Sequence, residues 1–394
     1  MRNLGTSLLA ATLLATPAVL DRTAHAQLIG QLEWKQAELP AHSTNPKVYV
    51  FPMGFEGKGQ LLTDISQKLI ETIVKDAKEQ KPDIIILKLN SAEFNKIWHL
   101  NDDSPEELGI PMFEEFRTMM TTLQDELKDI PQVMWVEDSV GYGTLMALGW
   151  PRLYMTSGAR LMGLTRVRDR AAGWDDPDVA AKMLAAATSI GKGLPQRGGY
   201  PEALADAMIF PERTLSVNFK GRSVDWLRDT TGVWVVDSSE ETPANFKAPL
   251  AEDLLLSDGT ADTLDDLMFL LGYREYTEIE SGKKLSEEWV TAWRAALEKV
   301  FELMQEASDT EDSVQGLTKR RQIYERAISL LKQYPCLELR RELRQSGVTK
   351  DSLEDQIDQI KKELQRYREA NRQGGGGGGG GGTGRGLGGS GRGR

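Results

Sequence analysis

Apolar residues recur along residues 47–273 in two alternating periods. Runs that are apolar on both faces predict buried strands, and segments with an apolar residue every three or four positions predict helices. The predicted strands are 47–53, 83–90, 132–138 and 152–157. The predicted helices between them include 61–80, with Leu61, Ile65, Leu69, Ile73 and Ala77 on one face, and a segment carrying Phe113, Phe116, Met120 and Leu123. Buried strands separated by helices predict an α/β fold, with a mostly parallel sheet flanked by helices.

The same alternation continues less regularly to about residue 280. Small and apolar residues predict helices from 176 to about 192 and at 201–209, and short strands are expected within 214–237. The segment 254–273 is interpreted as a strand, a turn and a helix whose first turn is capped by Thr263. We therefore predict one α/β domain over 47–280.

Residues 281–373 have a different period and predict a helical module. One stripe has heptad spacing, four, three, four and three residues apart, and consists of Leu353, Ile357, Ile360, Leu364 and Tyr367. Charged and amide side chains occupy the positions between them, which favours helical hairpins or a short coiled coil. One interpretation is that the stripe packs within the module or on the α/β domain. The other is that it forms the seam of a dimer.

Both ends of the chain have compositions unlike a folded domain. Residues 1–26 combine Arg2, an apolar run and Ala24-His25-Ala26, which predicts a secretory signal peptide. No later run is apolar enough to span a membrane, so a periplasmic or secreted location is expected. Residues 27–46 are interpreted as an exposed lead-in, and the Gly/Arg-rich tail 374–394 is expected to be disordered.

Charge and cysteine content remove several classes of protein. The formal net charge of −11 disfavours nonspecific nucleic-acid binding, so no nucleic-acid partner is expected. Cys336 is the only cysteine, which excludes an intrachain disulfide. Outside the predicted signal peptide the histidines are His42 and His99, far apart in the sequence. We therefore expect no metal site and no cofactor.

The order of sequence blocks resembles the ClpP/crotonase superfamily. These blocks are "VYVFPM", "DIIILKLNS", "QVMWVEDSVGYGTLMALGWPRLYMTSGARLMG" and "LLLSDGTADTLDDLMFLLG". The likeness covers about residues 47–273 and is greatest to NfeD-type and signal-peptide-peptidase-type serine proteases. It implies a ClpP/crotonase-like sheet domain and homo-oligomerisation. In active relatives a serine at a strand-to-helix turn is the nucleophile, a downstream lysine is its base, and a glycine-rich turn supplies the oxyanion hole.

The resemblance also implies that this apparatus is degenerate. The nucleophile position falls on Gly141, and Ala92, Glu93 and Phe94 stand where the oxyanion glycines would be. Ser139, two residues earlier, is the hydroxyl able to substitute by a local shift, but it is also a typical turn or cap residue. Lys182 falls near the position of the base, although a helical lysine is more often solvated.

Two functions from different classes follow from this pattern. The first is a binding scaffold for a peptide or a protein partner, in which Asn90, Ser91, Gly141, Tyr142 and Gly143 line the former site. Free N–H groups of Gly141 and Gly143 at the helix start would hold a carboxylate or a carbonyl, although backbone geometry alone also explains glycines there. The second is an active envelope serine endopeptidase that uses a relocated Ser139/Lys182 dyad.

Overall fold

The computed structural model describes residues 36–42, 45–55, 59–91, 110–169, 176–221 and 223–374. The chain divides into two compact units, residues 1–290 and residues 291–394. The predicted signal peptide, the first part of the lead-in and residues 375–394 of the tail lie outside the described residues. In the part of the chain that is described, no helix is both long and apolar enough to cross a membrane.

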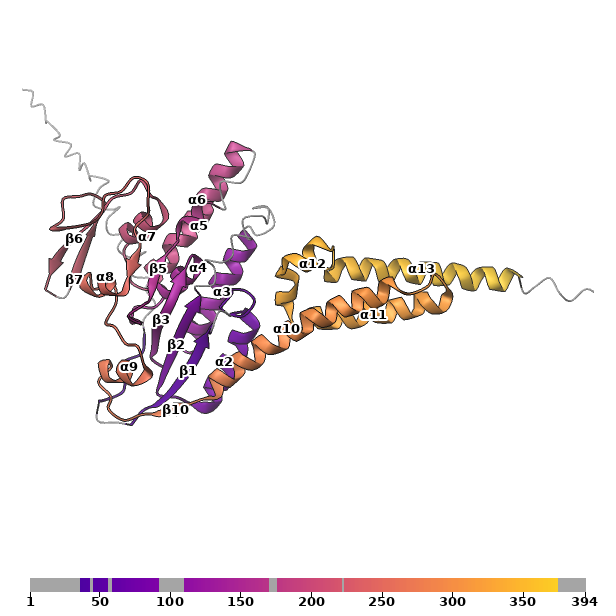
Figure 1. The fold of residues 1–394 in the computed structure, drawn as a ribbon, viewed down its shortest axis with the longest axis horizontal. Coiled ribbons are helices and arrows are strands. Elements are labelled where there is room, and N and C mark those ends of the chain that lie inside the picture. Colours follow the sequence, from indigo (N-terminus) through magenta and orange to yellow (C-terminus); the bar gives the residue numbers. More distant parts are fainter. Residues whose placement is uncertain are drawn as a thin grey trace, which may run out of the picture. The chain divides into compact units, whose positions relative to one another are not determined.

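The first unit is built on a mainly parallel sheet (Figure 1). Its strand order is β10-β1-β2-β3-β5-β9, and β4 also pairs with β3. The strands are β1 (Lys47–Met53), β2 (Ile84–Ser91), β3 (Gln132–Val140), β4 (Leu153–Met155), β5 (Arg160–Met162), β9 (Phe246–Lys247) and β10 (Thr277–Ile279). All these pairings are parallel except that of β5 with β9. The predicted α/β class with a mostly parallel sheet is therefore confirmed.

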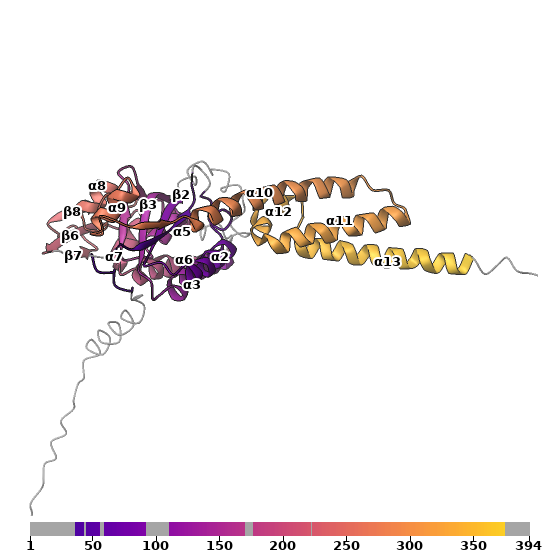
Figure 2. The ribbon, with the colours of Figure 1, turned by 90° about the horizontal axis from the view of Figure 1, so that it is seen from below.

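Helices cover both faces of this sheet (Figure 2). On one side lie α2 (Gln67–Gln80), α3 (Ile110–Glu126) and α6 (Pro177–Arg197), and on the other lies α9 (Leu264–Leu270). Alternate strand residues such as Val48, Ile86 and Trp135 form one buried cluster with Leu267 and Met268 of α9. This alternation follows from strand geometry, in which successive side chains point to opposite faces.

The predicted helix 61–80 starts later than its apolar pattern indicates. Helix α2 begins at Gln67 because the side chain of Ser66 accepts a hydrogen bond from the backbone N–H of Leu69 and caps the first turn. The preceding residues form a turn closed by the bond from Leu62 N–H to the Ile65 carbonyl. Both Leu61 and Ile65 are buried in that turn, so the apolar period alone could not separate turn from helix.

The segment 254–273 contains one correct and one wrong prediction. Its expected strand is absent from the described structure, where helix α8 (Ala248–Asp253) is followed by turns and an isolated bridge from Thr260 to Met155. The expected cap is confirmed, because Thr263 and Asp266 form a capping box at the start of α9.

Replacing Thr263 by alanine is expected to lower the free energy of unfolding by about 1 kcal/mol, since the N–H of Asp266 loses its acceptor. Chemical denaturation of the purified protein measures this change. Thr230→Ala, at an exposed loop position, is the control and should leave stability nearly unchanged. An equal loss in both variants would contradict the capping role.

The lead-in packs more closely than predicted over its described part. Gln36, Ala37, Leu39 and Pro40 are half-buried rather than exposed. The guanidinium of Arg152 donates to the carbonyl of Ala37, and Leu39 packs on the cluster beneath α9. A segment without apolar periodicity is thus held by a backbone carbonyl and by the side chain of Leu39.

A second, antiparallel sheet lies in the region where short strands are predicted. It consists of β6 (Leu215–Lys220) between β7 (Ser223–Leu227) and β8 (Trp234–Asp237). The helix α7 (Glu202–Ile209) precedes it and contacts β6 and β7. Both predicted helices of this region, 176–192 and 201–209, are confirmed as α6 and α7.

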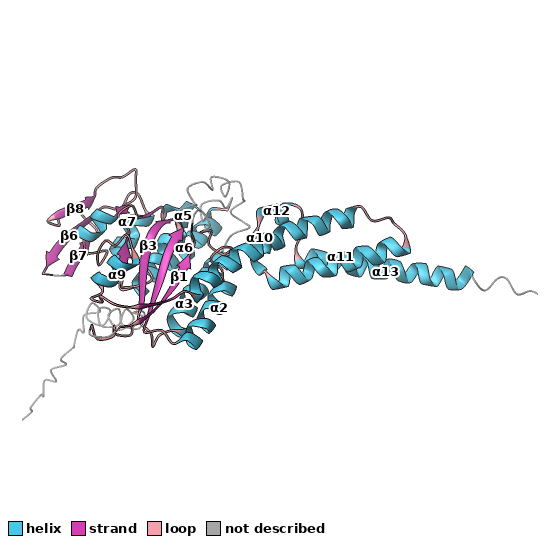
Figure 3. Ribbon diagram, turned by 60° about the horizontal axis from the view of Figure 1, so that its bottom comes forward, coloured by secondary structure: helices cyan, strands magenta, loops and turns pink. Residues whose placement is uncertain are grey.

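The second unit is helical (Figure 3). It contains the C-terminal part of α10 (Ser281–Ser308), α11 (Val314–Gln333), the short η3 (Pro335–Leu339), α12 (Arg341–Gln345) and α13 (Lys350–Gly374). Leu317 near the start of α11 packs with Ile360 and Leu364, and Lys332 near its end forms an ion pair with Glu354 near the start of α13, so these two helices are antiparallel. The heptad stripe is therefore buried within the unit itself as far as Leu364, whereas Tyr367 is exposed.

Candidate functional site

The carboxyl ends of β2, β3 and β5 meet at one edge of the parallel sheet. Residues on these three strand ends pair directly, since Ser91 is opposite Ser139 and Ser139 is opposite Leu161. Ligand sites of parallel α/β sheets lie outside such carboxyl ends. The structure therefore brings most of the sequence-predicted site residues to one place.

Gly141 forms a tight turn between β3 and helix α4 (Tyr142–Ala147). Its φ of 68° and ψ of −128° suit glycine and strain other residues. Its N–H donates to the carbonyl of Met162 at 2.8 Å. The prediction that Gly141 offers a free N–H group is therefore wrong, because the parallel strand β5 already takes that donor.

The hydroxyl of Ser139 is enclosed where the ends of β3 and β5 meet the start of α4, and we call this place the junction. Ser139 is fully buried, and its Oγ donates to the carbonyl of Arg160 at 2.9 Å. The same oxygen lies 3.3 Å from Oγ1 of Thr144, which in turn donates to the carbonyl of Met162. These bonds connect β3, β5 and α4. The Ser139 hydroxyl therefore stabilises the fold at this point.

Lys182 lies in a different environment. It belongs to the N-terminal half of α6, and its side chain is exposed. The buried residues of α6 that hold the helix on the domain all lie further along, from Ala187 to Pro195. The partners of Ser139 Oγ described above do not include Lys182, so the structure does not bring the proposed dyad within hydrogen-bond distance.

The remaining predicted binding residues pack tightly against one another. Ser91 is fully buried and donates through Oγ to the carbonyl of Gly59 at 3.0 Å. A Cβ added to Gly143 would lie 2.8 Å from the Cβ of Ser91, and one added to Gly59 would lie 1.8 Å from the carbonyl oxygen of Asn90. Tyr142 is buried, with its ring centroid 6.3 Å from that of Phe116. Close packing, rather than an open cavity, thus accounts for the glycines Gly59 and Gly143.

A row of charged and amide side chains remains partly open beside this closed junction. We call it the polar row, and it consists of Lys88, Asn90, Glu137, Asp138 and Arg160. Lys88 Nζ lies 2.7 Å from Oε1 of Glu137, and Asn90 Nδ2 donates to the other oxygen of Glu137 at 3.3 Å. Lys88 also lies 4.9 Å from the ring centroid of Trp135.

At the other end of the row Asp138 and Arg160 form a bidentate pair. The guanidinium donates through Nε and Nη2, and the backbone N–H groups of Arg160 and Ser139 donate to Oδ1 of Asp138. The hydrogen bond to Asp138 raises the pKa of Arg160 above its usual value. Of the polar row, sequence reasoning identified Asn90 alone. Two features of the sequence could have indicated the other members of the row. One is the lysine inside the apolar run "IIILKLN", and the other is the pair of carboxylates at the end of "VMWVED".

The predicted oxyanion positions Ala92, Glu93 and Phe94 lie outside the described residues, as does His99. Within the described ranges no group of three or more histidine, cysteine, aspartate or glutamate side chains is placed to hold a metal ion.

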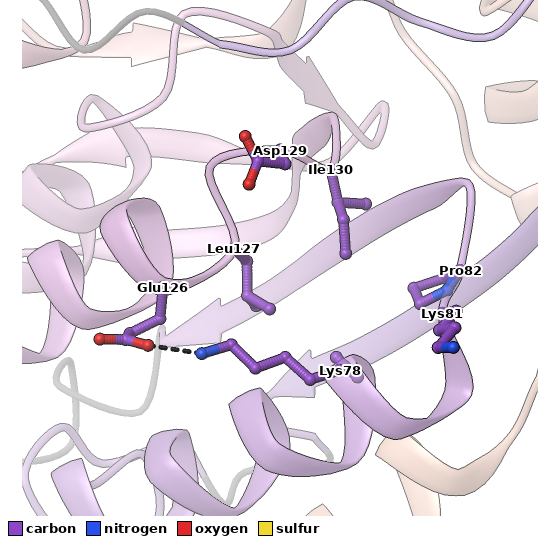
Figure 4. Close-up of a pocket in the computed structure, with 8 residues that line it drawn as sticks. Lys78, Lys81, Pro82, Glu126, Leu127, Asp129 and Ile130 are labelled. Carbon is purple, nitrogen blue, oxygen red and sulfur yellow. Dashed lines mark hydrogen bonds and ion pairs between the residues drawn. The ribbon is translucent and has the colours of Figure 1, made fainter.

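One pocket lies at the opposite, amino-terminal edge of the sheet (Figure 4). Its volume is about 330 Å³, and its walls come from the ends of α2 and α3 and the loops that follow them. An ion pair between Lys78 and Glu126 lies across it, with both side chains about half exposed. Since strand carboxyl ends and the predicted site residues are elsewhere, this pocket does not belong to the candidate site.

The fold and site define an α/β protein whose parallel-sheet edge carries a closed serine and glycine junction beside a polar row. No protein-family model matches the chain, and no curated protein matches it. A solved structure, the 1510-N membrane-bound stomatin-specific protease in a lysine-to-alanine mutant bound to a substrate peptide, resembles the chain with a TM-score of 0.35 and 13% identity. That similarity covers 63% of this chain and 99% of the other. The site is therefore interpreted from its own geometry.

Proposed function

We propose that this chain is an exported, catalytically degenerate relative of ClpP/crotonase-type serine proteases that binds a peptide or protein partner at the sheet edge. The observation that carries the proposal is the enclosure of Ser139. Gly141 has no side chain at the nucleophile position, and the nearby hydroxyl of Ser139 is bound to a backbone carbonyl inside the protein. An acyl-transfer nucleophile needs an accessible oxygen and a base within hydrogen-bond reach.

The alternative, an endopeptidase using Ser139 and Lys182, would require both residues to move. Ser139 would have to give up its bonds at the junction of β3, β5 and α4, and the exposed lysine on α6 would have to approach it. Within the described ranges the bonds of Ser139 support the closed state, so the degenerate site is better supported than the dyad.

Reaction with a fluorophosphonate probe tests this proposal directly. The purified wild-type protein and Ser139→Ala are incubated with the probe beside an active serine protease, and their intact masses are measured. We expect no adduct on either form of this protein, because the probe cannot reach a buried hydroxyl. A stoichiometric adduct on the wild type that disappears in Ser139→Ala would establish the protease instead.

The polar row supplies the recognition groups in this proposal. Its carboxylates, guanidinium, ammonium and amide can exchange hydrogen bonds with the backbone and side chains of a peptide. A peptide array can be probed with the wild type and with Lys88→Met/Glu137→Leu, which removes an ion pair without leaving an unpaired charge. Peptides bound by the wild type should be lost in the double variant, and unchanged binding would exclude the row from recognition.

Export and self-association complete the proposal. The N-terminal segment 1–26 supports delivery to the periplasm or beyond, and resemblance to the superfamily supports a homo-oligomer without a cofactor. Fractionation of cells that produce the whole chain tests the location. Recovery of the unprocessed chain from the cytoplasm would contradict export.

A further inference from the structure

The antiparallel sheet β7-β6-β8 exposes an unusual share of large apolar side chains. Val233 is 78% exposed, Val235 43%, Phe219 39% and Trp234 38%. The ring centroids of Phe219 and Trp234 are 6.3 Å apart on one face of the sheet, whereas Val235 points to the other face, because successive strand residues alternate. Three of these four residues lie in or directly before β8, and an exposed apolar edge strand is a template for pairing with another strand.

The rest of the sheet is firmly held by the domain. Leu215 and Val217 of β6 are buried, and the ring of Trp226 in β7 meets Phe246 edge to face with centroids 6.2 Å apart. The start of β8 is also anchored, because the N–H groups of Gly232 and Val233 donate to Ser216 Oγ and Asn218 Oδ1 of β6. The exposed strand is therefore a preformed surface.

The two outer strands of this sheet differ in charge. The outer strand β7 carries Asp225, which forms an ion pair with Lys220, and charged side chains discourage pairing at a sheet edge. The stretch 232–236, which covers most of β8, has no charged residue and no proline. Among the strands in the described part of the chain, β8 pairs with β6 alone, so its other edge can take a further strand.

We propose that β8 is the strand through which two copies of this chain pair edge to edge. A pair of identical strands related by a twofold axis runs antiparallel, and the uncharged stretch 232–235 can face its own copy without repulsion. Val236 has no partner in the register of β8 with β6, so β8 is irregular at that residue. The regularly paired part of β8 therefore lies before Val236. Pairing uses both copies of β8 and leaves the charged β7 strands outside, so the assembly closes as a dimer.

A lysine at Val235 tests this interface because it places two like charges close together across the pair. The control is Val314→Lys, the same substitution at a valine of matched exposure, 45%, in the helical unit, and Val235→Glu is a second test variant. Sedimentation velocity over a wide range of protein concentrations should show a monomer–dimer equilibrium for the wild type and for Val314→Lys. In Val235→Lys and Val235→Glu the dissociation constant should rise by at least about tenfold.

Mixing the two Val235 variants separates a direct contact from damage to the fold. Lysine and glutamate are opposite or diagonal across the pair in registers centred on Trp234 or Val235, so the mixture should recover dimers that neither variant forms alone. Circular dichroism checks that each variant is folded, and Val233→Lys replaces Val235→Lys if that variant is not.

A wild type that stays monomeric at every concentration would overturn the proposal, as would a dimer that Val235→Lys leaves intact. Capture of an added extended peptide by monomeric wild type would assign the edge to another partner and would also overturn it. The inference extends the proposed self-association. It does not depend on the outcome of the fluorophosphonate or peptide-array experiments, so each can fail separately.

Discussion

Asp138→Ala is expected to lower the free energy of unfolding by about 3 kcal/mol, among the largest effects of any single change at the sheet edge. The carboxylate of Asp138 accepts from the Arg160 guanidinium and from the backbone N–H groups of Ser139 and Arg160. Its loss leaves Arg160 without its counter-charge and two backbone donors without their acceptor. The pair is about one fifth to one third exposed, which keeps the effect below that of a fully buried pair.

The measurement is chemical denaturation of the purified protein, with two comparison variants. Glu71→Ala breaks the pair of Glu71 with Lys68, in which both side chains are at least half exposed, and should cost no more than about 0.5 kcal/mol. Asp138→Ala/Arg160→Met should recover part of the loss, because it leaves no unpaired charge. If Asp138→Ala and Glu71→Ala were equally mild, the bidentate pair would not stabilise the junction.

Gly143→Ala is expected to destabilise the protein by about 2 kcal/mol through overpacking. The new methyl group would lie 2.8 Å from the Cβ and 3.0 Å from the Oγ of Ser91, both within the buried junction. Neither neighbour is the end of a long side chain, so the strands themselves would have to shift. The unfolding free energy from chemical denaturation measures this cost.

Ser91→Gly removes the two atoms that the new methyl group would approach most closely and leaves the Cβ of Ser139, at an ordinary contact distance of 3.5 Å. Adding Gly143→Ala to a Ser91→Gly background should therefore cost much less than adding it to the wild type, which a double-mutant cycle measures. Gly193→Ala is the matched control, since a Cβ there meets nothing within 4 Å. Equal costs of Gly143→Ala in both backgrounds would show that the junction is looser than the structure indicates.

The order of the main strands and helices follows from local patterns in the sequence. The run 83–90 is apolar on both faces, which favours a buried strand wherever it lies in the sheet. Thr263 and Asp266 are three residues apart, so the capping box of α9 is likewise a local feature. The short strands β5, β9 and β10 were not predicted. Two or three residues carry no periodic signal, and such strands exist because a neighbour supplies the hydrogen bonds.

The candidate site was predictable only in part. The resemblance placed Asn90, Ser91 and Ser139 in one region, and the parallel pairing of β2 with β3 brings them together. The Asp138–Arg160 pair was missed because its partners are 22 residues apart in the sequence and meet only after β3 and β5 are in register. The same holds for Lys88 and Glu137 on adjacent strands.

The sequence by itself determined the α/β class, the helical character of residues 281–373 and the lack of a side chain at Gly141. These properties depend on residue type and short-range spacing, which act before any long-range contact forms. Only the tertiary structure decided that Ser139 is enclosed, that Lys182 is exposed and that β8 is an open edge. Burial, hydrogen-bond partners and strand edges depend on segments that are distant in the chain. A local sequence pattern does not show which distant segments will pack together.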